Sequence, residues 1–91
     1  MNIEYLPIGT VVNLKERNHV LFMIVGMLVE NESGERRDYI AVRYPTGVMN
    51  KDNYFFFNHE QIGDIFHMGF VNEDHNAYVS LIYAALKKDI K

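Results

Sequence analysis

Hydrophobic positions in the first half of the chain alternate or form short runs, which is typical of β-strands. Thr10–Leu14 is β-branched and partly alternating, and it predicts a half-buried strand. Val20–Glu30 is too short and too rich in Val, Ile and Phe to favour a helix, and Gly26 inside it predicts a bulge or bend. After a turn at Asn31–Gly34, Arg37–Tyr44 predicts an antiparallel return strand, because so short a connection cannot form a parallel crossover.

The aromatic run Tyr54–Phe57 shows no alternation. It is either a strand covered on both faces or a strand with one face exposed as an adhesive patch, and the pattern leaves both open. Asn58–Gln61 predicts a short helical turn with Asn58 as its N-cap. Ile65–Phe70 alternates and predicts the last strand. One face of this strand would carry Ile65, His67 and Gly69, and the other face would carry Phe66, Met68 and Phe70.

The period changes near Glu73, where a segment of about 73–88 predicts an amphipathic helix with one buried stripe. The stripe consists of Tyr78, Leu81, Ile82, Ala85 and Leu86. Acidic residues at the start of this segment and Lys87 and Lys88 at its end suit the helix dipole.

Strands followed by one helix predict an α+β fold. We expect a small, strongly bent antiparallel sheet, or an SH3-like barrel, of about five strands followed by the C-terminal helix. The sheet would cover about residues 5–71 and the helix about 73–88, in a single domain over residues 1–91. Whether the sheet closes into a barrel is left open by the pattern.

Composition narrows the class of protein. The 91 residues are 48% hydrophobic, and 9 Lys+Arg against 12 Asp+Glu give a formal net charge of -3. These values exclude a disordered chain, and the lack of cysteine excludes a disulfide scaffold. The acidic balance argues against nucleic-acid binding driven by phosphate neutralisation. The N-terminus lacks the pattern of a secretory signal, and the longest apolar run is far shorter than the roughly 20 residues that a helix needs to span a bilayer. We therefore expect a cytoplasmic protein.

Three histidines, His59, His67 and His75, recur every eight residues. A spacing of eight does not return to one face of a helix, and the three fall on different predicted elements, so no metal site is expected.

Other candidates for acid–base or nucleophilic chemistry lie in predicted turns, at helix ends or in mid-helix. They are the carboxylate pairs Glu30/Glu32 and Glu73/Asp74 and the hydroxyl groups of Ser33 and Ser80. Paired carboxylates need one member in an apolar pocket, and a nucleophilic serine needs a strained strand-to-helix elbow. Neither is predicted, so we expect no enzyme activity, no catalytic residue and no cofactor.

A basic face is one candidate binding surface. It would consist of Arg36, Arg37 and Arg43 with Lys15 and Arg17 from a nearby hairpin. Beside aromatic side chains, such a face has the ingredients of a single-strand nucleic-acid site. The alternative, favoured by the acidic neighbours Glu16, Glu35 and Asp38, is a solvated edge strand whose charge resists edge pairing.

The aromatic run is the other candidate surface, because exposed contiguous apolar surface marks protein-binding sites. The candidate partner-binding residues are Tyr54, Phe55, Phe56, Phe57, Tyr44 and Arg43.

Five sequence blocks, taken in order, resemble a family of small uncharacterised domains from Gram-positive bacteria (Firmicutes). The blocks are Tyr5–Lys15, Met23–Gly26, Asp38–Tyr39 with Tyr44–Gly47, Tyr54–Glu60 and Phe66–Phe70. The first carries the Tyr-Leu-Pro-Ile-Gly-Ser/Thr-Val-Val signature and the fourth a Phe-Asn-His-Glu box. The chain departs from the family at Glu16–Asn18, where a Gly-rich hairpin is common, and in a less acidic segment before the last helix.

Members of that family tend to be encoded in type VII secretion gene clusters near LXG-type toxins. The resemblance therefore implies a cytoplasmic accessory protein, a chaperone or adaptor whose partner is an LXG toxin or its small helical partner. Self-association stays open, no membrane is expected, and a nucleic-acid-binding barrel using the three arginines is the alternative. The family brings no catalytic residues, and the Asn58-His59-Glu60 box is interpreted as structural.

Overall fold

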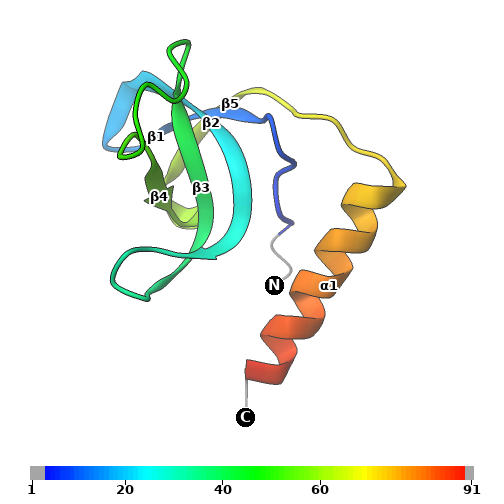
Figure 1. Cartoon of the computed structure of the whole chain (residues 1–91). Coiled ribbons are helices and arrows are strands. Elements are labelled where there is room, and N and C mark those ends of the chain that lie inside the picture. Colours follow the sequence, from blue (N-terminus) through cyan, green and yellow to red (C-terminus); the bar gives the residue numbers. More distant parts are fainter. Residues whose placement is uncertain (1–3, 90–91) are drawn as a thin grey trace.

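A computed structural model describes residues 4–89 of the chain (Figure 1). Five strands form one antiparallel sheet, and a helix follows them. The elements in chain order are β1 (Val11–Leu14), β2 (Arg17–Glu30), β3 (Arg36–Tyr44), β4 (Phe55–Phe57), the 3₁₀ turn η1 (His59–Gln61), β5 (Ile62–His67) and α1 (Glu73–Asp89). The predicted α+β class is confirmed.

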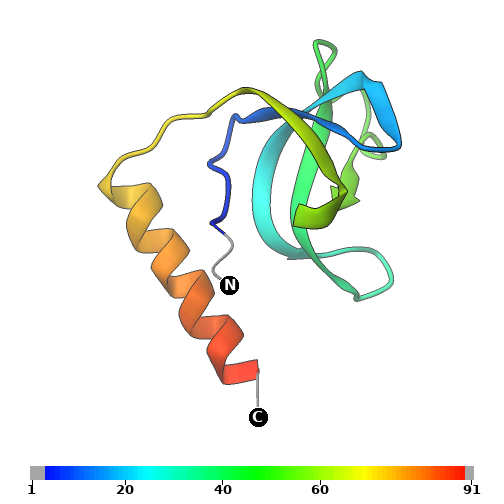
Figure 2. The ribbon, with the colours of Figure 1, turned by 180° about the vertical axis from the view of Figure 1, so that it is seen from behind.

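The strand order in the sheet is β4-β3-β2-β1-β5, and every neighbouring pair is antiparallel. The 14-residue β2 pairs with both β1 and β3, and the sheet curls strongly along it (Figures 1 and 2). Within residues 4–89, β4 and β5 are the two edges of the sheet and do not pair with each other. The sheet is therefore open, which decides between the two predicted forms in favour of a bent sheet.

A bulge bends β2 where the sequence predicts one. Ile24 pairs with Ala41 and Gly26 pairs with Ile40, so Val25 is the additional residue on β2. A Cβ atom on Gly26 would lie 2.5 Å from Cγ2 of Ile40, closer than real Cβ atoms approach. The glycine thus lets β3 lie close to the bulge.

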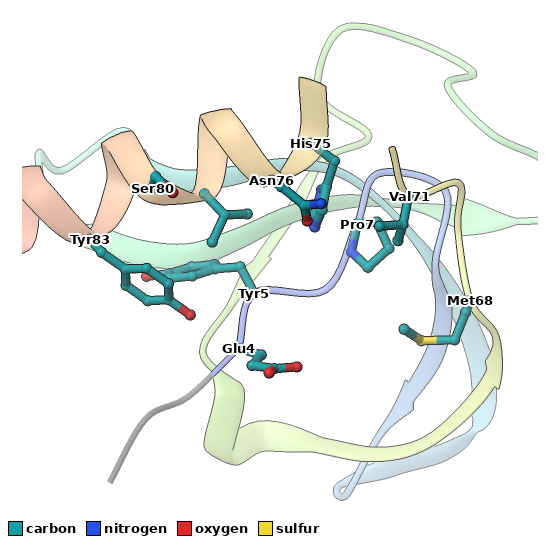
Figure 3. Close-up of a pocket in the computed structure, with 10 residues that line it drawn as sticks. Glu4, Tyr5, Pro7, Met68, Val71, His75, Asn76, Ser80 and Tyr83 are labelled. Atoms are coloured by element: carbon teal, nitrogen blue, oxygen red, sulfur yellow. The ribbon is translucent and has the colours of Figure 1, made fainter. Parts of the chain in front are cut away.

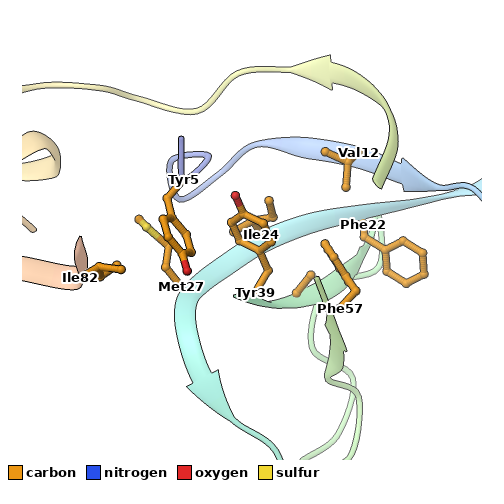
Figure 4. Close-up of a cluster of buried hydrophobic side chains, with 9 residues drawn as sticks. Tyr5, Val12, Phe22, Ile24, Met27, Tyr39, Phe57 and Ile82 are labelled. Carbon is orange, nitrogen blue, oxygen red and sulfur yellow. The ribbon is translucent and has the colours of Figure 1, made fainter. Parts of the chain in front are cut away.

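The core fills the inner face of the curled sheet (Figure 4). Its members alternate along each strand, so that Phe22 and Ile24 of β2 are both fully buried. The other members are Val12, Tyr39, Ala41, Phe57 and Met27 from the sheet, Tyr5 from the N-terminal segment and Ile82 from α1. All three parts of the chain therefore share one hydrophobic cluster.

α1 stands beside the sheet, and the N-terminal segment lies between them in both views (Figures 1 and 2). Ile82 is 4% exposed, and Val79, Tyr83 and Leu86 are half-buried against the core. These four residues follow the i, i+3, i+4, i+7 spacing of one helix face. Among residues 4–89, no helix combines the length and the apolar character that a bilayer crossing requires.

The start of the predicted helix is confirmed and its end extends to Asp89, but the buried stripe is corrected. Ile82 and Leu86 do face the core, whereas Tyr78 is 50% exposed, Leu81 is 66% exposed and Ala85 is exposed. The physical reason is that α1 carries apolar residues on two adjacent faces. Both fit the helical period, and packing against the core, which includes the contact of Tyr83 with Tyr5, selects between them.

The predicted last strand is also corrected. β5 begins at Ile62 and ends at His67, and every residue from Gly63 to Met68 is exposed, so neither face of this strand is covered. Two residues after the end of β5, the N–H of Gly69 donates to Oγ1 of the buried Thr10 at 3.0 Å. That bond holds the chain beside Thr10 before it continues to α1.

Candidate functional site

β4 divides the aromatic run between the two faces of the sheet. Phe57 is fully buried, and the ring of Phe55 packs edge-on against Phe22 with 5.1 Å between centroids. Tyr54 is 40% exposed and Phe56 is half-buried, and they point to the opposite face. One face of the run is thus core and the other is partly exposed. Phe57 belongs to the core, which corrects its place among the expected contact residues.

Tyr54 and Phe56 line a hollow of about 510 Å³ on the outer face of the sheet. Its other walls are Ile40, Lys51, Asp52 and the turn residues Asn31, Glu32 and Ser33. A charged and polar rim of this kind surrounds the two aromatic rings with hydrated groups. Polar and apolar groups therefore line this hollow about equally.

Tyr44 lies in a different hollow, of about 490 Å³, whose walls are mostly apolar. We name it the Tyr44–Phe66 hollow, and its walls are Gly9, Val11, Leu21, Met23, Tyr44, Phe66 and His67. Tyr44 is 52% exposed and Phe66 is 57% exposed. Leu21 pairs directly with Tyr44 across β2 and β3, so both side chains stand on the face opposite the core.

The sequence pointed to Tyr44 but missed its neighbours Met23 and Phe66. Residues 21 and 23 alternate with the buried Phe22 and Ile24, so the period of β2 already places them on the outer face. What the pattern lacks is the position of β5, which brings Phe66 beside β1 and β2.

The three candidate arginines do not form one cluster. Arg36 and Arg37 begin β3 and Arg43 lies near its end, seven residues or roughly 23 Å along the strand. The guanidinium of Arg37 forms an ion pair with Glu35 at 3.0 Å, and Arg36 stands opposite Glu30 in the ladder. The basic charge at this end of the strand is therefore balanced locally. β3 is an interior strand, which corrects the edge-strand interpretation.

A hydrogen-bonded cluster fastens the N-terminal segment to β3 and η1. The hydroxyl of Tyr5 donates to Oδ1 of Asp38 at 3.1 Å, and the N–H of Leu6 donates to the hydroxyl of Tyr39 at 2.8 Å. Tyr39 in turn shares a hydrogen bond of 3.1 Å with Nδ1 of His59, whose backbone N–H donates to Oδ2 of Asp38 at 2.9 Å. The ring of Tyr5 contacts that of His59 edge-on, with 4.7 Å between centroids.

Burial shapes the protonation of this cluster. It raises the pKa of both Tyr5 and Tyr39 well above the ordinary value, and for Tyr5 the nearby Asp38 carboxylate adds to the rise. Burial also lowers the pKa of His59, although Asp38 acts in the opposite direction. Within residues 4–89, no buried side-chain nitrogen or oxygen lacks a hydrogen-bond partner. This hydrogen-bonded cluster, which we name the fastening cluster, holds the N-terminal segment against β3 and η1.

The Asn58-His59-Glu60 box forms the turn that the sequence predicts, with Asn58 at the N-cap position of η1. Oδ1 of Asn58 accepts the N–H of Asp38 at 2.9 Å, and the N–H of Asn58 donates to Oε1 of Gln61 at 2.8 Å. The box therefore joins η1 to β3, whereas Glu60 is exposed.

A further hollow of about 540 Å³ lies where the N-terminal segment, residues 68–71 and α1 meet (Figure 3). The rings of Tyr5 and Tyr83 lie near one end, and Met68 and Val71 line the other. His75 faces it, His67 borders the Tyr44–Phe66 hollow, and His59 belongs to the fastening cluster. Among the described residues, no group of three or more His, Cys, Asp or Glu is placed to hold a metal.

Comparison with known families matches residues 5–78 to the model described as "Domain of unknown function (DUF4176)". The matched range contains all five strands and ends at Tyr78, within α1. No curated protein and no solved structure matches the chain.

Proposed function

The chain belongs to the DUF4176 family, and on that basis we propose that it is a non-enzymatic protein-binding accessory module. Its role would be that of a cytoplasmic chaperone or adaptor for an effector of type VII secretion. The order of the sequence blocks supports the choice of effector, because family members with these blocks tend to be encoded near LXG-type toxins. The surface of the domain supports binding as its mode of action.

The observation that carries the proposal is the Tyr44–Phe66 hollow. Two half-exposed aromatic rings border a concavity whose walls are Val11, Leu21 and Met23. Apolar surface of this kind is stabilised when a partner side chain removes it from water. Aromatic residues around a concavity are also the usual anchors of protein interfaces.

The sheet edge beside the hollow suits an extended partner segment. β5 is an edge strand, and its residues from Gly63 onward are exposed. A segment that pairs with this edge would gain backbone hydrogen bonds from β5 and specificity from side chains seated in pockets. Phe66 belongs both to β5 and to the hollow, so one segment can use both features.

Co-expression with the effector encoded in the neighbouring gene tests the proposal, with affinity then measured on the purified proteins. We expect Tyr44→Asp and Phe66→Asp to weaken binding by about 30-fold or more, as loss of a central interface anchor does. Met49→Asp is the matched control, because Met49 is 71% exposed and lies outside the hollow. It should change affinity less than twofold.

Two results would contradict the proposal. One is a monodisperse chain that does not bind the effector at any concentration tested. The other is an equal loss of binding in Met49→Asp and in the two hollow variants, since that would place the contact elsewhere. Circular dichroism of each variant shows whether the fold is kept.

A further inference from the structure

α1 has a second apolar face that its own sheet does not cover. Tyr78 is 50% exposed and Leu81 is 66% exposed, and the small residues Ala77, Ala84 and Ala85 are exposed around them. The buried contacts of the helix are made by a different face, that of Ile82 and its neighbours. The exposed face is therefore available without any change in the fold.

The exposed residues follow the spacing of a helix-pairing seam. Asp74, Tyr78, Leu81, Ala85 and Lys88 are separated by four, three, four and three positions. This is the heptad spacing that keeps one stripe against a partner helix. We name these five residues the outer stripe of α1. All five are exposed.

The charges at the two ends of α1 select the direction of pairing. Glu73 and Asp74 are exposed in the first turn, and Lys87 and Lys88 are exposed in the last. Two copies of α1 side by side in parallel would bring like charges together at both ends. Two antiparallel copies would bring acidic residues against lysines at both ends, which is favourable.

The charged ends of the outer stripe are complementary about Leu81. Asp74 lies seven residues before Leu81 and Lys88 lies seven residues after it, so a twofold rotation through Leu81 sets each Asp74 opposite the other copy's Lys88. The same rotation sets Tyr78, three residues before Leu81, at the level of Ala84, a small exposed residue that lies beside the outer stripe and not in it. Charge is thus matched by a single twofold operation, as in an isologous interface.

We propose that α1 pairs with α1 of a second copy of the chain, antiparallel and centred on Leu81. The seam from Asp74 to Lys88 is about 21 Å long at 1.5 Å per residue, so the contact is small and the dimer is reversible. We expect a dissociation constant on the order of 10 µM. The outer stripe shares no residue with the Tyr44–Phe66 hollow, so this pairing and effector binding would use different residues.

Sedimentation velocity over a range from about 1 to 500 µM tests self-association directly, spanning the expected dissociation constant on both sides. The charge pattern is tested by two double variants, Glu73→Lys with Asp74→Lys and Lys87→Glu with Lys88→Glu. Each variant alone places like charges against like, and we expect its self-association to weaken at least tenfold. Mixed in equal amounts, the two variants should form a mixed dimer within about threefold of the original affinity.

Cross-linking gives an independent test, because the chain contains no cysteine. Leu81→Cys places one thiol next to the proposed twofold axis, so mild oxidation should link two copies rapidly. Ser33→Cys, in the turn between β2 and β3, is the matched exposed control and should link slowly. Leu81→Asp should give a folded monomer, because Leu81 is 66% exposed.

Any of three outcomes overturns the proposal. The chain stays monomeric at 500 µM, Leu81→Cys links no faster than Ser33→Cys, or the mixed charge variants fail to associate although circular dichroism shows both helices intact. The charge changes oppose the helix dipole by about 0.3–1 kcal/mol each, so that helix measurement accompanies them.

Discussion

Replacing Gly69 with alanine tests the contact that holds the chain beside Thr10 before it continues to α1. A Cβ atom at this position would lie 2.9 Å from the carbonyl carbon of Ile8 and 3.0 Å from the nitrogen of Thr10, and closer still to the Ile8 carbonyl oxygen. All three are backbone atoms. The backbone of Thr10 bonds to Pro7 at 3.1 Å and to Ile24 at 2.9 Å, so it cannot move aside as the end of a side chain can.

The expected cost follows from two changes. Forcing a methyl group into a packed contact costs about 1–3 kcal/mol. Moving the backbone also breaks the bond from the N–H of Gly69 to the fully buried Thr10 hydroxyl, which costs about 1–3 kcal/mol. Alanine offsets about 0.4–1 kcal/mol of this cost, because it has fewer backbone conformations than glycine in the unfolded chain. Mid-range values of the three contributions give a fall of about 3 kcal/mol in the free energy of unfolding, which lowers Tm by roughly 12–24 °C in a domain of this size.

Thermal and urea unfolding, followed by circular dichroism, measure the change. Gly34→Ala is the control, because a Cβ at Gly34 meets no atom within 4 Å and only its φ of +80° disfavours alanine. That variant should lose about 1–2 kcal/mol. A Gly69→Ala protein that melts at or above the original temperature would falsify the close approach, since only the effect on the unfolded chain would then remain.

Three further predictions concern the fastening cluster and α1. Tyr39→Phe should cost about 1–3 kcal/mol in chemical unfolding, because it leaves a backbone N–H and a ring nitrogen of His59 without their partner; a loss below about 0.5 kcal/mol would contradict this. Because burial lowers the pKa of His59, the contribution of His59 to stability is complete above pH 6.5 and is lost as pH falls below that value. Because burial raises the pKa of Tyr5 and Tyr39, the contribution of these tyrosines is lost as pH rises above 10. Melting temperatures measured across this pH range check both effects, and His59→Gln should reduce the loss of stability at acidic pH. Ile82→Ala should lower the free energy of unfolding by about 2–3 kcal/mol, and Leu81→Ala should lower it by less than about 0.5 kcal/mol. Equal losses in the two variants, measured at concentrations where the chain is monomeric, would contradict the assignment of the helix faces.

Local pattern was sufficient to predict most of the fold. The β-branched residues of β2 and the antiparallel return along β3 follow from period and turn chemistry, and the bulge follows from Gly26. The change of period near Glu73 located α1 within one residue at its C-terminal end. These features depend on neighbours in the sequence, which is why the sequence reveals them.

The features that the sequence did not reveal depend on contacts between distant segments. The choice between the two apolar faces of α1 is made by packing against the core, which includes Tyr5, more than seventy positions away. Thr10 holds the chain after the end of β5, and the fastening cluster joins Asp38 to His59. The Tyr44–Phe66 hollow likewise needs β5 to lie beside β1.

The position of the N-terminal segment between the sheet and α1 bears on the order in which the chain folds. The rings of Tyr5 and Tyr83 pack with 6.1 Å between centroids, although 78 positions separate them. Closing so long a loop is entropically costly unless the sheet has already shortened it. On a ribosome, the sheet can form while α1 is still being synthesised, and Tyr5 then lacks its outer wall. We expect docking of α1 to be the last folding step, and the species before it to be the one most exposed to aggregation and proteolysis.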